Sequence, residues 1–415
     1  MSLARVRGDR TFVEDVALQD IAARFGTPCY VYSKALLSAN YAGYRSALGG
    51  RDALICYAVK ANANLAILNL FARLGAGFDI VSAGELRRVL AAGGSAAKVV
   101  FSGVGKRRDE MRAALEAGIH CFNVESASEL LQLNEVAGAL GKRAPVSLRV
   151  NPDVDPKTHP YISTGLRSAK FGIAYDEARP LYAQAALLPH LAIRGIDCHI
   201  GSQLLDPAPA GEAAAKIVAL VDLLAKDGIV IDHIDLGGGM GIRYRDERVP
   251  TAEEYLAPLL AATAGRRERL VLEPGRSLVG NAGLLLTRVE VLKHGEEKNF
   301  AVVDAAMNDL ARPALYDAWH DIEPVTRRMG TATRYEVVGP VCESGDFLGH
   351  DRDLCLAEGD LLAIMSAGAY GMAMSSNYNS RPRAAEVLVD GATAHLVRRR
   401  ETIEELYAQE SVPPG

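Results

Sequence analysis

The sequence has no long hydrophobic run and no cysteine motif. No stretch approaches the roughly 18 consecutive apolar residues of a membrane-spanning helix. The N-terminus also has no signal-peptide core, so we expect a cytoplasmic protein without a membrane partner. The six cysteines form no Cys-x-x-Cys pair and no histidines show metal-ligand spacing, so we expect no bound metal. Cys56, Cys121 and Cys198 lie in apolar runs, which predicts reduced, buried thiols.

The chain also lacks an excess of basic residues. Its 46 Lys and Arg are outnumbered by 51 Asp and Glu, and the formal net charge is −5. Because nucleic acids and anionic membranes bind basic patches, neither is an expected partner. The 415 residues, of which 49% are hydrophobic, are enough for one large domain with a well-buried core and a smaller second domain.

Short apolar runs alternate with helical stretches between about residues 55 and 280. Eight such β–α units predict right-handed crossovers and, by their number, an α/β fold with a closed (β/α)8 TIM barrel, which we assign to residues 34–280. A doubly wound open sheet is the alternative. The eight runs are ICYAVKA, GFDIVS, KVVFSG, HCFNVES, VSLRVNP, IRGIDCHIGS, IDHIDLGGG and RLVLEPGRS.

A polar residue or a glycine stands at or just beyond the carboxyl end of every one of these runs. In a (β/α)8 barrel all these ends share one face, where active sites are built. Strands of a sheet without a site have no reason to end in this way, so the pattern favours the barrel. The residues are Lys60, Ser82, Ser102, Glu125, Arg149, His199, Gly237 and Glu273.

Residues 281–415 contain strands without regular intervening helices, which predicts an antiparallel β domain, a sandwich or a barrel. EVLVDGATAHLV is typical of a hairpin, with Asp390-Gly391 as its two-residue type I′ turn. Residues 1–33 include the strand-like PCYVYS, and we expect them to pack with this domain.

Lys60 ends the first barrel run, ICYAVKAN. A lysine at the mouth of a buried strand is desolvated, which favours its neutral amine. A neutral amine is a nucleophile and the usual partner of a carbonyl cofactor such as pyridoxal 5'-phosphate. The alternative is a lysine that extends its ammonium group to water.

The seventh run ends in LGGGMG, with four glycines in five positions, residues 237–241. Such a loop is either a tight turn or a place where backbone N–H groups approach an anion. Barrel phosphate sites commonly use the loops after strands seven and eight, which favours the anion. The pattern is not G-x-G-x-x-G, so a dinucleotide site is not indicated.

Two further strand ends allow more than one interpretation. Glu273, in EPGR, is a general base, an ion-pair partner of Arg276, or the anion that faces a pyridinium nitrogen. His199, in CHIGS, is either a core histidine or a ring stacked against a cofactor.

Six motifs occur in the order found in the alanine-racemase-like (fold type III) pyridoxal-phosphate decarboxylases, and the chain resembles this family from about residue 25 to 385. They are YAVKAN, HIGSQ, GGGMG, EPGR, CESGDFL and GAYG. MNDLARPALYDAWH and GPVCESGDFLG are similar to members that convert meso-2,6-diaminopimelate to L-lysine and CO₂, the last step of lysine biosynthesis. The resemblance implies that activity.

The resemblance also implies a role for each catalytic residue. Lys60 would hold pyridoxal 5'-phosphate as a Schiff base, His199 would stack on its ring, and Glu273 would pair with the ring nitrogen. Cys342 is the family's proton donor, although without the resemblance it would be interpreted as a buried thiol. The residues expected to bind the cofactor are Lys60, His199, Ser202, Gly239, Glu273, Gly275, Arg276 and Tyr370.

The substrate's far end carries an ammonium and a carboxylate, on a carbon that we expect to be D-configured. A planar cationic clamp for the carboxylate and an anion for the ammonium would recognise it. Cys342 and Glu343 are expected to enter from a second subunit, so the active unit would be a homodimer. The residues expected to bind the substrate are Arg276, Arg312, Tyr316, Glu343 and Tyr370.

Two alternatives are a decarboxylase of another basic amino acid, of the ornithine, arginine or carboxynorspermidine type, and a non-catalytic pyridoxal-phosphate-binding homologue. The expected clamp of Arg312 and Glu343 argues against the first, because ornithine and arginine lack a distal carboxylate. Lys60 and Cys342 argue against the second, because non-catalytic homologues usually lose one of them.

Overall fold

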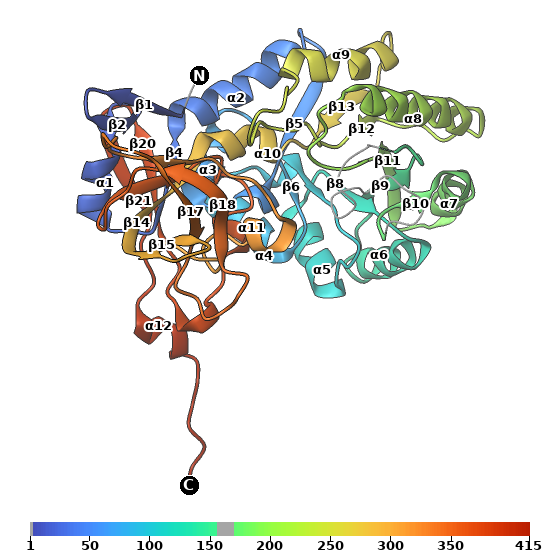
Figure 1. Cartoon of the computed structure of the whole chain (residues 1–415). Helices are drawn as coiled ribbons and strands as arrows, with labels where there is room; N and C mark the ends of the chain where they lie inside the picture. Colours follow the sequence, from blue (N-terminus) through green and yellow to red (C-terminus); the bar gives the residue numbers. More distant parts are fainter. Residues whose placement is uncertain (1–2, 156–169) are drawn as a thin grey trace. The chain divides into compact units, whose positions relative to one another are not determined.

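The computed structural model describes residues 3–155 and 170–415. The chain divides into two compact units (Figure 1). The β unit comprises Met1–Ala39, Arg243–Glu247 and Val279–Gly415, and the barrel unit comprises Asn40–Ile242 and Arg248–Leu278. Arg243–Glu247 therefore groups with the β unit although it lies between barrel elements in the sequence.

Eight parallel strands close into a barrel, which confirms the predicted (β/α)8 fold and excludes the open sheet. Each strand pairs with the next, and the last closes onto the first, with Leu270 opposite Ala53. The two-residue strand β10 (Ile173–Ala174) lies beside β9. The barrel strands are β5 (Ala53–Ala58), β6 (Gly77–Ile80), β7 (Val99–Phe101), β8 (Cys121–Val124), β9 (Ala144–Asn151), β11 (Leu191–Asp197), β12 (His233–Asp235) and β13 (Arg269–Leu272).

Helices alternate with the barrel strands and surround them (Figure 1). Several begin at a residue whose side chain accepts a hydrogen bond from the first turn: Asn64, Ser82, Ser126 and Thr251. The helices are α2 (Lys34–Ala47), α3 (Leu65–Arg73), α4 (Ala83–Ala91), α5 (Arg108–Ala117), α6 (Ala127–Ala139), α7 (Tyr175–Leu187), α8 (Ala208–Lys226), α9 (Ala252–Ala262) and α10 (Arg276–Val279), with short 3₁₀ turns at Val59–Ala61, Ala96–Lys98 and Gly280–Ala282.

The barrel strands bury apolar side chains and thiols. Leu54, Cys56, Val100, Cys121 and Val271 form one cluster in which each side chain is at most 4% exposed. Burial raises the pKa of the Cys56 and Cys121 thiols well above the ordinary value, so both stay protonated and unreactive. The expected reduced, buried thiols are confirmed for these two residues and for Cys198.

The β unit contains one large sheet with the strand order β18-β17-β15-β14-β4-β20-β21. The N-terminal strand β4 lies between β14 and β20, so the start of the chain is an internal part of this sheet. Its strands are β4 (Cys29–Ser33), β14 (Gly283–His294), β15 (Asn299–Val303), β16 (Ile322–Pro324), β17 (Thr333–Val338), β18 (Phe347–Leu354), β19 (Leu361–Ile364), β20 (Ala385–Asp390) and β21 (Thr393–Arg398).

Smaller elements complete the β unit. A three-stranded sheet and a helix precede β4, and the remaining helices are one or two turns long. These elements are β1 (Ala4–Arg7), β2 (Arg10–Val13), β3 (Val16–Ala17), α1 (Leu18–Phe25), α11 (Arg312–Tyr316) and α12 (Ile403–Tyr407), with 3₁₀ turns at Met372–Met374 and Tyr378–Ser380.

Two sequence-based predictions for the β unit were wrong in detail. The large sheet is mixed, because β15 pairs with β17 and β4 pairs with β20 in parallel. The hairpin pairs Asp390 with Thr393, so its turn residues are Gly391 and Ala392. Only Gly391 has a positive φ, of 59°, which is the pattern of a type II′ turn and not of type I′.

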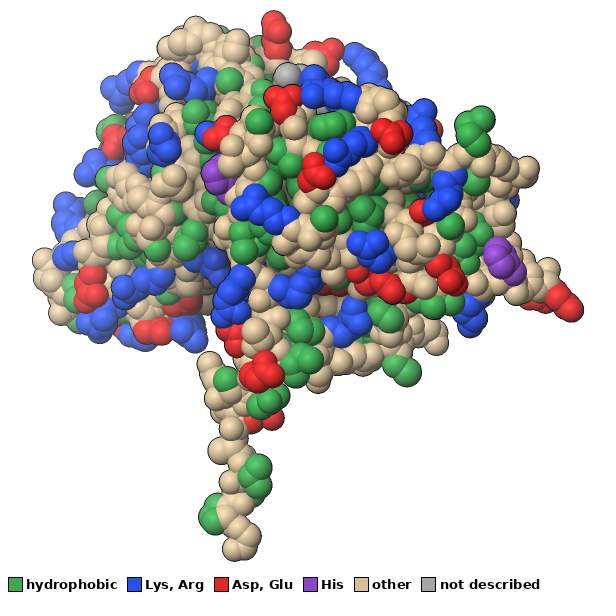
Figure 2. All heavy atoms as spheres, turned by 90° about the vertical axis from the view of Figure 1, so that its left-hand side faces the viewer, with side chains coloured by type: hydrophobic (Ala, Val, Ile, Leu, Met, Phe, Trp, Pro, Cys, Tyr) green, Lys and Arg blue, Asp and Glu red, His purple; other side chains and the backbone are tan. Residues whose placement is uncertain are grey.

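Among the helices of the described residues, none is both long and apolar enough to cross a membrane. Figure 2 shows one face of the molecule, on which basic side chains are interspersed with acidic and hydrophobic ones.

Candidate functional site

The carboxyl end of the barrel brings together the polar residues that the sequence places at strand ends. Ser102, Glu125 and Glu273 directly follow β7, β8 and β13. His199 and Gly237 come two residues after β11 and β12. Arg149 lies inside β9, two residues before that strand ends at Asn151.

Lys60 is less buried than its sequence context predicts. The strand ends at Ala58, and Lys60 lies on the following 3₁₀ turn with 41% of its side chain exposed. Its ammonium Nζ is 2.8 Å from Oδ2 of Asp79, a fully buried residue of β6. The predicted desolvation of Lys60 was therefore wrong. Sequence reasoning missed Asp79, whose signal is a single carboxylate in the apolar run GFDIV.

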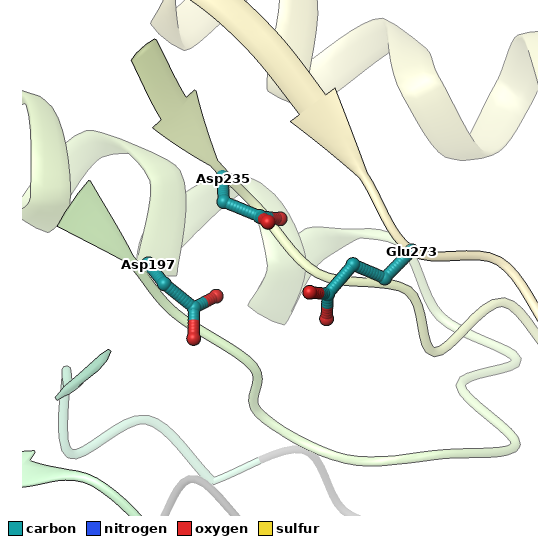
Figure 3. Close-up of side chains that lie close together, drawn as sticks. All are labelled: Asp197, Asp235 and Glu273. Atoms are coloured by element: carbon teal, nitrogen blue, oxygen red, sulfur yellow. The ribbon is translucent and has the colours of Figure 1, made fainter. Parts of the chain in front are cut away.

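Three buried carboxyl groups converge at the ends of neighbouring strands. Figure 3 shows Asp197, Asp235 and Glu273 pointing toward one another, and their oxygens lie within 4.8 Å. Their exposure is at most 6%. Such oxygens suit a hard divalent cation, and without one the acids must share protons, because three buried negative charges repel strongly.

The surroundings of these three acids raise their pKa values, so the carboxyl groups stay protonated at a higher pH than exposed ones do. Burial, followed by the neighbouring Asp235 carboxyl, raises the pKa of Glu273 well above its ordinary value. Burial also raises the pKa of Asp235 to about 7, although the Gly237 N–H opposes that shift. The sequence did not single out Asp197 or Asp235, each of which reads as one acid at the end of an apolar run.

Glu273 is held by one donor from β8 and one from the residue that follows β7. Asn123 Nδ2 donates to Glu273 Oε1 at 3.2 Å, and Ser102 Oγ lies 3.4 Å from the same oxygen. Asn123 also donates to Ser102 Oγ at 3.1 Å. Because Asn123 is fully buried in β8, this network fixes the direction of the Glu273 carboxyl group. Asn123 is a second residue that sequence reasoning missed.

Arg149 provides positive charge beside this acidic group. Its guanidinium lies 3.4 Å from Glu125 and 3.9 Å from Asp197, and all three side chains are less than 10% exposed. Although burial opposes its charge, Glu125 and Asp197 raise the pKa of Arg149 above the ordinary value. A permanent cation therefore balances part of the buried negative charge.

His199 is held as a neutral ring. Gly238 N–H donates to its Nδ1 at 3.2 Å, which places the proton of a neutral imidazole on Nε2. Burial, with the positive charges of Arg149 and Lys60, lowers the pKa of His199 well below its ordinary value. An uncharged, oriented ring suits stacking against a flat cofactor.

The glycine loop is both a tight turn and a close approach of backbones. Gly237 and Gly239 have φ of 66° and 109°. A Cβ at Gly238 would lie 2.2 Å from the Glu273 carbonyl oxygen, and one at Gly239 would lie 2.6 Å from the Gly201 carbonyl oxygen. Side chains are therefore excluded at Gly238 and Gly239, where the loop packs directly on the loops after β11 and β13.

The same loops present hydrogen-bond donors suited to a phosphate. Arg276 Nε and Nη2 lie 3.3 Å and 3.1 Å from Ser202 Oγ, which places a guanidinium beside a hydroxyl. Gly275 packs so closely that a Cβ would lie 3.0 Å from Cβ of Ala58. A cation, a hydroxyl and glycine backbone form the donor set that a phosphate requires, so the barrel end fits pyridoxal 5'-phosphate.

The β unit holds the remaining predicted residues. Arg312 is 8% exposed at the start of α11, and Tyr316 is half-buried at the end of this helix. Tyr370 is half-buried and has a φ of 55°, a strained conformation for a tyrosine. Cys342 and Glu343 are exposed on a loop.

That exposed loop is anchored at both ends. Asn379 Oδ1 accepts from Cys342 N–H at 2.7 Å. The carboxylate of Asp346 accepts from Val341 N–H at 2.8 Å and from Met307 N–H at 2.6 Å. Cys342 and Glu343 are therefore presented on a backbone that is held in place.

Comparisons with known proteins give one family for the barrel region and for nearly the whole chain. Residues 34–280 match the family described as pyridoxal-dependent decarboxylase, pyridoxal binding domain. The chain is 64% identical over 408 residues to the diaminopimelate decarboxylase of Pseudomonas aeruginosa, which covers 98% of each sequence. It resembles the structure of diaminopimelate decarboxylase from Helicobacter pylori complexed with L-lysine, with a TM-score of 0.92 and 41% identity over 94% of this chain and 98% of that one. For the M. jannaschii enzyme in co-complex with L-lysine, the TM-score is 0.95 and the identity 39%, over 99% and 98%.

Proposed function

Because the chain belongs to the pyridoxal-dependent decarboxylases and is similar to diaminopimelate decarboxylases over its full length, we propose that its barrel face and its β unit supply the residues of that reaction as follows. The reaction removes CO₂ from meso-2,6-diaminopimelate and leaves L-lysine, with pyridoxal 5'-phosphate as the cofactor. The observation that supports the assignment of the site most is the convergence of Lys60, Glu273 and the glycine loop at one end of the barrel.

The barrel residues hold the cofactor. Ser202, Gly239, Gly275 and Arg276 would hold its phosphate, and the amine of Lys60 would hold its aldehyde group. Gly237 and Gly238 are not part of this set, because their N–H groups donate to Asp235 and His199. Tyr370 of the β unit completes the set. When bound, pyridoxal 5'-phosphate supplies an electron sink for the pair left behind by CO₂.

Glu273 and His199 tune this electron sink. Because the pKa of its carboxyl group is raised, Glu273 would hold a proton for the pyridine nitrogen of the cofactor. Asn123 and Ser102 keep that carboxyl group in place. His199, which is uncharged because its pKa is lowered, would stack on one face of the cofactor ring without opposing the positive charge of that ring.

The stereochemistry of the reaction corrects one expectation from the sequence. Because the product is L-lysine, CO₂ leaves the D centre, and the distal centre that remains is L-configured and not D-configured. Arg276, Arg312 and Tyr316 bind the distal carboxylate, Glu343 binds the distal ammonium, and Tyr370 closes the site over the substrate. A planar guanidinium pairs with a carboxylate through two parallel hydrogen bonds.

Cys342 and Glu343 act in the site of a second subunit. Their exposure on an anchored loop supports this assignment, because a proton donor and an ammonium ligand are useful only where they meet a site. The active unit is therefore a homodimer, which we place in the cytoplasm.

The test compares substrates side by side. CO₂ release is measured from meso-diaminopimelate, D-lysine, L-ornithine and L-arginine with the same enzyme preparation. D-lysine is the matched control, since it has the reacting D centre and lacks only the distal carboxylate. We expect meso-diaminopimelate to exceed the others by at least about 10⁴-fold in kcat/KM, because unpaired polar groups discriminate at this level. Equal rates with ornithine would overturn the assignment.

A further inference from the structure

Arg312 is held from two sides, by His320 and by Tyr244. Its Nη1 lies 2.8 Å from Nε2 of His320. Its Cζ lies 4.5 Å from the centroid of the Tyr244 ring. The Tyr244 and His320 rings meet edge to face, with centroids 5.3 Å apart and planes at 78°. One guanidinium therefore has an imidazole at one nitrogen and an aromatic face beneath its plane.

The hydrogen bonds determine the protonation of His320. Its Nδ1 lies 2.8 Å from the carbonyl oxygen of Met365, and because a carbonyl only accepts, Nδ1 must carry a proton. A guanidinium only donates, so Nε2 must be unprotonated to accept from Arg312. The chain of bonds has one direction, from Arg312 through a neutral imidazole to the Met365 carbonyl.

The position of His320 is itself fixed. Its side chain is fully buried, and its carbonyl oxygen accepts from Arg352 Nη2 at 2.9 Å. The neighbouring Trp319 ring lies 3.2 Å from Cζ of Arg352 and 4.3 Å from Cζ of Arg245. The backbone and the side chain of His320 are thus both held by hydrogen bonds, and the imidazole offers Arg312 an acceptor in a fixed position.

We infer that His320 is a positioning residue that, as a neutral imidazole, orients the Arg312 guanidinium toward the distal carboxylate of the substrate. The inference rests on the proposed function, which assigns that carboxylate to Arg312. A long arginine side chain that must be ordered when substrate arrives binds more weakly than one already oriented, so His320 strengthens recognition without touching the substrate. Its loss should weaken only ligands that have the distal carboxylate.

Two substitutions separate the two hydrogen bonds of His320. In His320→Gln, the side-chain oxygen can reach the former Nε2 position and accept from Arg312. In His320→Asn, the shorter amide can donate to the Met365 carbonyl but cannot reach Arg312. The pair differs by one methylene and preserves polarity, so a purely structural role predicts similar effects from both.

The ligands are L-lysine and cadaverine, which differ only in the distal carboxylate. Their affinities are measured by calorimetry on the holoenzyme, and kcat and KM for meso-diaminopimelate are measured in parallel. For His320→Asn we expect about a 10-fold loss of L-lysine affinity, the size of one hydrogen bond to a charged group, and a matching rise in KM. Cadaverine affinity and kcat should change less than about 3-fold, and His320→Gln should stay within about 3-fold of the parent enzyme throughout.

Each result decides between the inference and the proposed function. Equal losses for Asn and Gln, or equal losses for L-lysine and cadaverine, would overturn the positioning role. Arg312→Ala is the reference: if it weakens L-lysine selectively and His320→Asn does not, the inference fails and the proposed function stands. If Arg312→Ala leaves L-lysine affinity unchanged, the assignment of the carboxylate to Arg312 is wrong, and the inference fails with it.

A measurement on the parent holoenzyme covers the case in which His320→Asn does not fold. Nitrogen-15 NMR of histidine-labelled enzyme, with His320→Gln to identify the signal, reports which nitrogen carries the proton. Protonated Nδ1 and bare Nε2 at pH 7.5 support the inference. The opposite tautomer, or an imidazolium, would overturn it.

Discussion

Asp235 Oδ1 accepts a hydrogen bond from Gly237 N–H at 2.9 Å, which ties a buried acid to the first glycine of the loop that closes the barrel end. The other oxygen of Asp235 has no hydrogen-bond partner among the described residues and lies in the group with Asp197 and Glu273. When Asp235 is protonated, this second oxygen is therefore the one available to carry the proton.

The first prediction concerns Asp235→Asn. Its pKa is raised to about 7 in the folded chain, above about 3.9 when unfolded, so its contribution to stability is complete below pH 4 and is lost as the pH rises toward 7. The amide keeps the acceptor for Gly237 and removes the titration. Between pH 5 and 7 the parent apoenzyme should lose up to about 1.4 kcal/mol per pH unit that the variant does not lose. Urea unfolding at several pH values measures this, and parallel curves for both proteins would contradict it.

The second prediction concerns acid stability at the opposite end of the barrel strands. His233, 2% exposed at the start of β12, has its pKa lowered to about 3 by burial and then by His120. The unfolded chain binds a proton below about pH 6.5, so stability falls as the pH drops from 6.5 toward 3. His233→Leu should remove up to about 1.4 kcal/mol of this loss per pH unit, whereas exposed His395→Leu should not. Thermal unfolding between pH 4.5 and 7.5 compares them, and identical acid profiles for the two variants would refute the assignment.

The third prediction is that Lys60→Ala abolishes turnover and the borohydride-reducible link to the cofactor. Lys60 lies on the 3₁₀ turn that follows β5, and its ammonium group contacts the buried Asp79. Lys34→Ala, which removes a half-buried lysine paired with Asp390, is the control and should keep both properties. A reducible link that persists in Lys60→Ala would show that another lysine holds the cofactor.

The fourth prediction is that Glu273→Gln binds pyridoxal 5'-phosphate and loses about 10²–10⁴-fold in kcat, the range of one positioned proton donor. An amide can accept from Asn123 and Ser102 but cannot hold the proton that a ring nitrogen needs. Cofactor content from absorbance separates binding from turnover. A near-native kcat in this variant would show that Glu273 does not supply the proton on which the electron sink depends.

The fifth prediction tests the shared site. Lys60→Ala and Glu343→Ala subunits are each inactive in the proposed mechanism, but a mixed dimer contains one site with both residues intact. Mixed dimers should therefore regain about half of the native activity per dimer, as expected for one site of two. No recovery, after subunit exchange has been demonstrated by differently tagged chains, would mean that Glu343 serves the site of its own chain.

The barrel and much of the candidate site could be predicted from local patterns in the chain. The eight apolar runs became the eight strands, because parallel strands are joined by right-handed helical crossovers and the helices bury the apolar side chains of the sheet. Lys60, His199 and Glu273 were found because strand ends of a barrel share one face, so a local pattern there has a spatial meaning.

Tertiary structure alone decided which buried groups meet. Asp197, Asp235 and Glu273 come from three strands about 40 residues apart, and each one by itself reads as a single acid after an apolar run. Lys60 shows the same limit, since one 3₁₀ turn after Ala58 left it 41% exposed. So does His320, whose bond to Arg312 depends on a neutral ring fixed by Met365, 45 residues away. Proximity, burial and proton placement depend on neighbours from distant segments, and only the folded chain brings those neighbours together.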